Sequence, residues 1–238
     1  HFFPAGGLES EGSAVTVDAT GSIYITGHFL QHISFGDGNL LAYDVGLYVA
    51  KFDADGTLAW RKTFSGNAQT WGRAIAVDDL GSIYVGGWLT GSVDLGGGEL
   101  IAGGSESDAF LAKFDSLGHH VWSKHFGDAS AQAVEVLTID LSGNVVFGGS
   151  FAGAIDVGGG NLYSAGSRDV FLAKVDSAGN HLWSKRYGNF DHQSIGSLAT
   201  TSSGGFVLGG SFYGNIDFGA YGTTAAGARP GRAATASG

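Results

Sequence analysis

Short hydrophobic runs recur along the chain, and polar turns separate them. Residues 23–25, 83–85 and 145–147 are apolar at consecutive positions rather than at alternate ones. A strand that is apolar at every position is expected to be buried on both faces. All apolar runs are far shorter than the roughly 18 residues that a membrane-spanning helix needs. The pattern therefore predicts β-strands packed between other layers, and no membrane span.

Asp-x-x-Gly tetrapeptides follow many of these runs and predict the turns between strands. Asp begins such a turn, and Gly occupies the position where φ becomes positive, which is typical of hairpins. We therefore expect the runs on either side of each turn to be antiparallel neighbours. The tetrapeptides occupy residues 18–21, 53–56, 78–81, 115–118, 140–143 and 176–179.

The chain repeats itself with a period of about 61 residues. Gly27, Gly87, Gly149 and Gly210 recur at spacings of 60, 62 and 61. The tryptophans at 60, 122 and 183 recur at spacings of 62 and 61. A fixed period of this length indicates an array of one small structural unit. Residues that recur are therefore explained first by the architecture of the unit.

Each unit contains four hydrophobic runs, which predict a four-stranded antiparallel sheet between two like sheets. Sheets stacked in this way are the blades of a β-propeller. A propeller blade usually takes about 40–50 residues, and the excess here lies between the second and third runs. There, segments around Asp94, Asp156 and Asp217 predict an extra turn or short hairpin. A β-solenoid would also explain a period, but it would not need paired hairpins.

The predicted fold is all-β: a partial β-propeller with about three complete four-stranded blades plus fragments. Three blades cannot close a ring, which takes about four to eight, so we expect neighbouring blades outside this chain. The last segment shares nothing with the repeat and is expected to be a disordered tail or the product of a frame break. The expected units are 1–12 (the end of a preceding blade), 13–72, 73–134, 135–195, 196–219 (an incomplete blade) and 220–238 (the tail).

The repeat resembles a known family. The string DVFLAKVDSAGNHLWSKRYG at 169–188, preceded by segments such as GSIYVGG at 81–87, is similar to the bacterial β-propeller repeat family. The resemblance extends from Ser13 to Gly219. It implies a propeller in an exported protein, located outside the cell or at its surface, and it implies no catalytic residues. No signal peptide is recognisable in the sequence.

A weaker resemblance is to quinoprotein-type propellers. Ala50, Gly56 and Trp60 have the spacing of their tryptophan-docking motif, and the next two units repeat it. The resemblance implies that the indoles of Trp60, Trp122 and Trp183 pack between neighbouring sheets. The quinone site of such enzymes cannot be mapped here, because its vicinal disulfide needs cysteine and the chain has none.

Composition and the repeat together argue against several kinds of chemistry. A net charge of −10 disfavours nucleic acid as a partner. All six lysines and the histidines at 120 and 181 occupy repeated positions, and the aspartates are explained by turns. His28 and His32 are four residues apart, a spacing that serves metal binding on a helix rather than on a strand. We therefore expect no catalytic residue, no metal site and no cofactor.

Residues that do not recur are the candidates for ligand contact. After the repeated glycine pair the units carry His28, Trp88, Ser150 and Ser211, and Trp71 also lies outside the consensus. An aromatic ring that the blade does not require can stack on a sugar or anchor a protein. Local packing is the alternative explanation. Trp88, Trp71 and His28 are the candidate ligand contacts.

The function expected from the sequence is non-catalytic interaction or scaffolding, with a protein or polysaccharide as partner. A carbohydrate-binding, lectin-like propeller is the first alternative, and it predicts weak multivalent sugar binding. A fragment of a propeller enzyme is the second alternative. It predicts a cluster of non-recurring polar residues around the central channel, and no such cluster is recognisable in the sequence.

Overall fold

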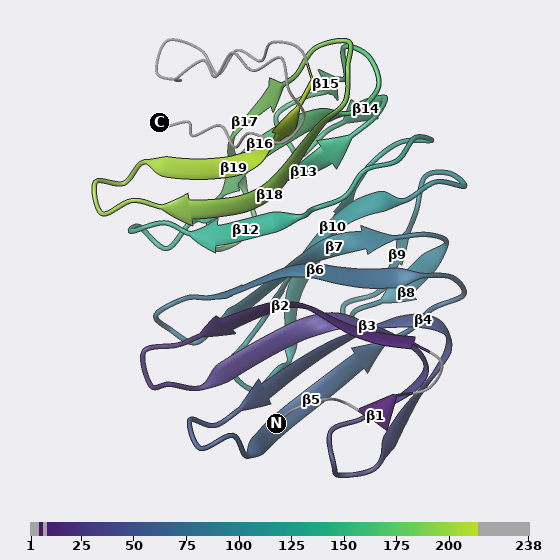
Figure 1. Ribbon diagram of the computed structural model, residues 1–238, viewed down its shortest axis with the longest axis vertical. Coiled ribbons are helices and arrows are strands. Elements are labelled where there is room, and N and C mark those ends of the chain that lie inside the picture. The colour runs from purple at the N-terminus through teal and green to yellow at the C-terminus, as the bar shows by residue number, and fades with distance from the viewer. Residues whose placement is uncertain (1–4, 7–8, 214–238) are drawn as a thin grey trace.

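The computed structural model describes residues 5–6 and 9–213, and these residues form only strands, turns and loops. The sheets follow one another in sequence order, face against face, from the purple N-terminal sheet to the yellow-green C-terminal hairpin (Figure 1). No helix in this part of the chain is long and apolar enough to cross a membrane.

The first two sheets each contain four strands in antiparallel succession. In the first sheet the short strand β1 joins this meander by pairing with β3. In the second, β6, β7, β10 and β11 form the sheet, and β8 pairs with β9 outside it. The strands are β1 (Ala5–Gly6), β2 (Glu9–Val17), β3 (Ile23–Ser34), β4 (Asn39–Phe52), β5 (Leu58–Phe64), β6 (Thr70–Val77), β7 (Ile83–Leu89), β8 (Ser92–Asp94), β9 (Glu99–Ile101), β10 (Asp108–Phe114) and β11 (His120–Phe126).

The third sheet repeats the second, and a two-stranded hairpin follows it. These elements confirm the predicted all-β fold of three four-stranded blades plus a fragment. The strands are β12 (Val136–Ile139), β13 (Val145–Phe151), β14 (Ala154–Ile155), β15 (Leu162–Tyr163), β16 (Asp169–Val175), β17 (His181–Tyr187), β18 (Gln193–Thr200) and β19 (Phe206–Phe212).

The extra residues of the first three repeats form the predicted hairpin between the second and third strands of the blade, and the segment around Asp217 lies outside the described residues. In the second and third blades it is a separate ribbon, β8–β9 and β14–β15. In the first blade it is continuous with β3 and β4, which are 12 and 14 residues long. A bulge between Leu30 and His32 interrupts this long ladder, and Gln31 adopts a φ of 68° there.

The Asp-x-x-Gly turns have the predicted geometry. In the β6–β7 turn, the carboxylate of Asp78 accepts hydrogen bonds from the backbone N–H groups of Leu80 (3.0 Å) and Ser82 (2.8 Å). Gly81 has a φ of 78°, which glycine adopts without a steric penalty. In the equivalent β2–β3 turn, the side-chain hydrogen bond from Thr20 is the largest effect lowering the pKa of Asp18, to about 2.

The repeated tryptophans pack between neighbouring sheets, as the resemblance to quinoprotein-type propellers implies. The indole N–H of Trp60 donates to the carbonyl oxygen of Ser116 in the next blade, at 3.2 Å. Trp122 makes the same bond to Ser177 at 3.2 Å, and the ring of Trp183 lies 6.0 Å from that of Phe206. The indoles therefore join each blade to the next.

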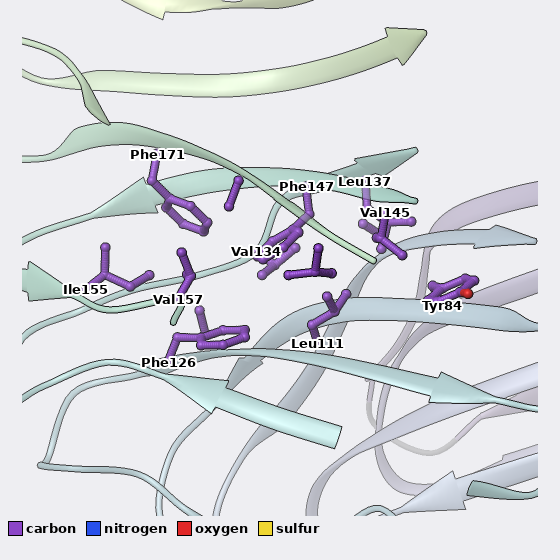
Figure 2. Close-up of a cluster of buried hydrophobic side chains, with 14 of the residues drawn as sticks. Tyr84, Leu111, Phe126, Val134, Leu137, Val145, Phe147, Ile155, Val157 and Phe171 are labelled. Atoms are coloured by element: carbon purple, nitrogen blue, oxygen red, sulfur yellow. The ribbon is translucent and has the colours of Figure 1, made fainter. Parts of the chain in front are cut away.

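The core fills the spaces between successive sheets. Side chains of the second and third blades, including Tyr84, Leu111, Phe147 and Phe171, form one continuous cluster (Figure 2). Residues 83–85 and 145–147 are 0% exposed, as their apolar runs predict. At roughly 25 cal/mol per Å² of buried apolar surface, these interfaces are the main stabilising contribution to the stack.

The expectation of burial on both faces is wrong for the first repeat. Tyr24 is 0% exposed, but Ile23 and Ile25 are only half-buried. Val15 and Val17 on the adjacent β2 are 65% and 56% exposed. The reason is that no described sheet covers this outer face of the first blade.

The expected unit boundaries stay a prediction. Strands β2, β6 and β18 begin at Glu9, Thr70 and Gln193, three or four residues before the units expected to start at 13, 73 and 196. One observation bears on the assignment of 1–12 to a preceding blade: Ala5 pairs with Ser34 of β3, which belongs to the first described sheet. Residues 220–238, the expected tail, lie outside the described residues.

Candidate functional site

The first strand of each blade contains one extra residue at the same place. In the β2–β3 ladder, Gly12 pairs with Gly27 and Ala14 with Thr26, which leaves Ser13 without a partner. A β-bulge of this kind re-aims a side chain while the ladder continues on both sides. The equivalent extra residues are Arg73 in β6 and Gly196 in β18, and before β12 the pairing of 132 with 151 and of 136 with 148 makes Glu135 the extra residue.

The recurring glycine of each repeat faces this bulge. A Cβ on Gly27, Gly87 or Gly149 would lie 1.8–1.9 Å from the carbonyl oxygen of the residue two positions before the bulged one. At Gly210 the corresponding distance is 2.2 Å. No larger residue fits at such distances, so glycine is required here by close approach.

Three aromatic side chains stack beside the first two bulges. The rings of His28 and Trp71 are 3.4 Å apart at an angle of 24°, and those of Trp71 and Trp88 are 5.1 Å apart at 17°. Trp71 and Trp88 are opposite partners in the β6–β7 ladder, whereas His28 comes from β3 of the preceding blade. The structure thus brings all three candidate residues into one stack across a blade interface.

The stack is buried at one end and open at the other. His28 is 1% exposed, whereas Trp71 and Trp88 are half-buried. Neither ring nitrogen of His28, nor the indole nitrogen of Trp71, has a hydrogen-bond partner within the described residues. Burial is the largest effect on the pKa of His28 and lowers it, against the opposing charges of Glu11 and Glu9. The neutral imidazole is therefore the favoured form, and its ring stacks on the indole of Trp71.

Charged side chains on the bulges extend the aromatic stack. The guanidinium of Arg73 lies 5.9 Å from the ring of Trp71, within range of a cation–π contact. In the next blade Glu135 accepts a hydrogen bond of 2.9 Å from the hydroxyl of Ser150. Burial raises the pKa of Glu135, although Ser150, Arg73 and Arg168 each act to lower it. Arg73 therefore acts electrostatically on both the His28 and the Glu135 ends of the site.

The sequence offers no recognisable cluster of non-recurring polar residues around a central channel. The structure brings Arg73 and Glu135, with Glu11 and Ser150 nearby, together beside the bulges of the first strands. The sequence reasoning missed them because the bulge that presents them is defined by strand pairing. One signal was present: positions 13, 73, 135 and 196 follow the repeat spacing of 60, 62 and 61, yet carry four different residue types.

Several of the other titratable groups named in the sequence analysis have structural contacts. Lys124 donates to the carbonyl of Gly179, Lys113 to that of Ser177 at 3.1 Å, and Lys174 pairs with Asp140. The ring of His120 lies against Gly97 of the triple-glycine loop. Within residues 5–6 and 9–213, no group of three or more histidine, aspartate or glutamate side chains is placed to hold a metal ion. The site consists of a flat aromatic surface, a guanidinium and a half-buried carboxyl group.

Comparison with protein families identifies the segment that holds half of this site. Residues 65–91, which include the β6 bulge and both stacked tryptophans, match the family described as beta-propeller repeat. This segment is similar to a β-propeller repeat. The three sheets are accordingly propeller blades, and the aromatic stack lies where one β-propeller repeat meets the next.

Among known proteins, the chain is similar to the regulatory protein FlaEY of Caulobacter vibrioides. The two are 28% identical over 165 residues, which is 66% of this chain and 17% of FlaEY. The matched part of this chain therefore spans about a sixth of that relative's length.

Two solved structures are similar in outline. One is a protein of unknown function from Bacteroides caccae, with a TM-score of 0.46 and 10% identity, covering 95% of this chain and 61% of that one. The other is hydrazine synthase from Kuenenia stuttgartiensis, with a TM-score of 0.39 and 13% identity, covering 89% and 60%. At these values neither likeness bears on the function of this chain.

Proposed function

We propose that this chain is a non-catalytic interaction module, and that the surface of β6 and β7 carrying the His28–Trp71–Trp88 stack is the binding face. The stack carries the proposal, because these rings occupy positions that the blade architecture leaves free to vary. Flat aromatic rings beside a guanidinium and a carboxyl group suit multi-point recognition on a pre-organised surface.

The partner is a protein or a polysaccharide of the bacterial exterior. The resemblance to repeats of exported proteins supports the location, and the net charge of −10 disfavours nucleic acid. The name of the Caulobacter relative, a regulatory protein, is compatible with binding rather than catalysis. One observation favours a polysaccharide: the half-buried indoles of Trp71 and Trp88 stack on each other, and the guanidinium of Arg73, a hydrogen-bond donor, lies 5.9 Å from the ring of Trp71.

A glycan array with the full chain tests this proposal. We expect binding to one class of oligosaccharide, and we expect Trp88→Ala to weaken it at least about tenfold, since burying an aromatic side chain contributes roughly 1.5–3 kcal/mol. Leu80→Ala is the matched control, because Leu80 is 88% exposed on the turn at the other end of β6. At the same ligand concentration, tryptophan fluorescence should change less in Trp88→Ala than in the control.

Two results would contradict the proposal. If no glycan binds and Trp88→Ala leaves the binding of every protein partner unchanged, the stack is packing alone. If a bound oligosaccharide is cleaved, and Glu135→Gln abolishes the cleavage, the module is an enzyme.

A further inference from the structure

The two described blade interfaces share one arrangement, an indole seated on a turn glycine. A Cβ on Gly118 would lie 3.2 Å from ring carbons of Trp60, and a Cβ on Gly179 would lie 3.2–3.3 Å from ring carbons of Trp122. Each indole N–H donates to the carbonyl two residues before that glycine, at 3.2 Å. Glycine thus provides both the space and the turn that present the acceptor.

A lysine two residues after the tryptophan completes the arrangement. The ammonium of Lys124 donates to the carbonyl oxygen of Gly179. The Cε atom of Lys62 is the atom nearest to a Cβ placed on Gly118, at 3.2 Å. A Trp-x-Lys strand therefore meets the glycine turn of the next blade with both side chains.

The first blade carries the same turn with nothing seated on it. Gly56 has a φ of 86°, close to the 77° of Gly118 and the 82° of Gly179. Gly118 and Gly179 are buried, whereas Gly56 is exposed and has no described atom within 4 Å of its Cβ position. Ala54 holds the position of the acceptor residues Ser116 and Ser177.

An apolar groove runs beside this turn across the outer face of the first sheet. Its volume is about 590 Å³, and its lining includes Val15, Ile23, Ile25, Phe52 and Gly56. Val15 is 65% exposed, whereas its repeat equivalents Ile75 and Leu137 are 7% and 9% exposed under the neighbouring blade. The groove is therefore lined by apolar residues like those at the two blade interfaces, but no described strand covers it.

We propose that this groove is a docking site for the Trp-x-Lys strand of another repeat of the same kind. Its indole covers Gly56 and donates to the carbonyl of Ala54, and its lysine reaches the carbonyl of Gly56. A second copy of the present chain is a poor occupant, because the indoles of Trp60 and Trp122 are already hydrogen-bonded and Trp183 packs against Phe206. The partner must bring a tryptophan of its own.

A peptide with the sequence of residues 119–127, HHVWSKHFG, is the probe. Added to the full ¹⁵N-labelled chain, it should shift the amide signals of residues 54–56 and the signals of Ile23 and Ile25. The same peptide with alanine in place of tryptophan should bind at least about tenfold more weakly, since a buried aromatic side chain contributes roughly 1.5–3 kcal/mol.

Two variants locate the site. Gly56→Asn should weaken peptide binding about tenfold, because any side chain there crowds the indole, while asparagine tolerates the positive φ. Gly204→Asn is its matched control: Gly204 has a φ of 84°, lies in the β18–β19 turn and also has no described atom within 4 Å of its Cβ position. Val15→Ser, which alters only an exposed side chain, should weaken binding in a second, independent way.

Three outcomes would overturn the inference. The first is equal binding of the two peptides, and the second is a set of shifted signals away from the first sheet. The third is a self-association of the chain that Gly56→Asn abolishes, which would make a second copy the occupant. Trp88→Ala should leave peptide binding unchanged, so this result and that of the glycan array are independent.

Discussion

The turn glycines at the blade interfaces differ from ordinary turn glycines in what lies over them. Both Gly118 and Gly56 have positive φ, but only Gly118 lies under an indole. A side chain at either position should therefore destabilise the fold through the positive φ. At Gly118 it should also destabilise the fold by crowding the indole.

Alanine at each position separates the two parts. We expect Gly56→Ala to lower the free energy of unfolding by about 1 kcal/mol through the positive φ. Gly118→Ala should cost at least about 1 kcal/mol more, because its Cβ would press on Trp60. Urea denaturation of both variants measures the difference, and equal losses would show that the indole moves aside freely.

His28 makes stability depend on pH. Its pKa is lowered from 6.5 in the folded chain, chiefly by burial, so the unfolded chain binds the proton more tightly. The stabilising contribution of neutral His28 is thus fully present above pH 6.5 and is lost as the pH falls below that value.

The variant His28→Phe keeps an aromatic ring and removes this titration. We expect its free energy of unfolding to change less between pH 7.5 and pH 5 than that of the unmodified chain. His192→Gln, which alters an exposed histidine, should leave the pH dependence as it was. If His28→Phe retains the whole pH dependence, another group is responsible.

An Asp-x-x-Gly turn can also bind a strand outside the hairpin that it closes. At the β12–β13 turn, Asp140 accepts backbone hydrogen bonds and also pairs with Lys174 of β16. Burial would raise the pKa of Asp140, but these contacts and that of the Asn144 side chain together lower it to about 2. One carboxylate thus closes the turn and joins it to the third strand of the blade.

Replacing Asp140 with asparagine tests this coupling. Because the folded-state pKa lies below the ordinary 3.8, the stabilisation is present above about pH 4 and is lost as the pH falls towards 2. We expect Asp140→Asn to cost about 1–2 kcal/mol at pH 7 and little at pH 2. Asp191→Asn, at an exposed aspartate, is the control; a constant loss at every pH would contradict the ionic explanation.

The elements that local chemistry specifies were predictable from the sequence. The Asp-x-x-Gly tetrapeptides gave the turns, the runs at 83–85 and 145–147 gave buried strands, and the long period gave the extra hairpins. The bulges were not predictable, because they depend on strand pairing. Ser13 and Arg73 are the extra residues only because the residues just before them pair with Gly27 and Gly87. The contact of His28 with Trp71 also depends on packing between repeats, which no local pattern encodes.

Across the whole molecule, stability is expected to be uneven. Strands β7 and β13 are buried along nearly their whole length between neighbouring sheets. Strand β2 occupies the same place in its blade as β6 but has mostly exposed or half-buried residues. On the uncovered first blade, the hydrogen bonds that protect backbone amides should break with less loss of buried surface.

Hydrogen exchange measures this gradient. Peptides covering β2 should exchange at least about tenfold faster than peptides covering β6, and β7 and β13 should be slowest. The comparison is matched, because β2 and β6 are equivalent strands of successive repeats. Uniform exchange over all three blades would show that the stack opens as a single unit.

At the bulge on the first strand of each blade, some positions are constrained by strand pairing and one position is free to vary. The glycine and carbonyl of the bulge hold the ladder, while the extra residue changes from serine to arginine to glutamate to glycine without altering the pairing on either side. Gene duplication can therefore multiply the scaffold unchanged, and point mutation can then rewrite these four positions separately. An engineer could randomise the same four codons and retain the fold.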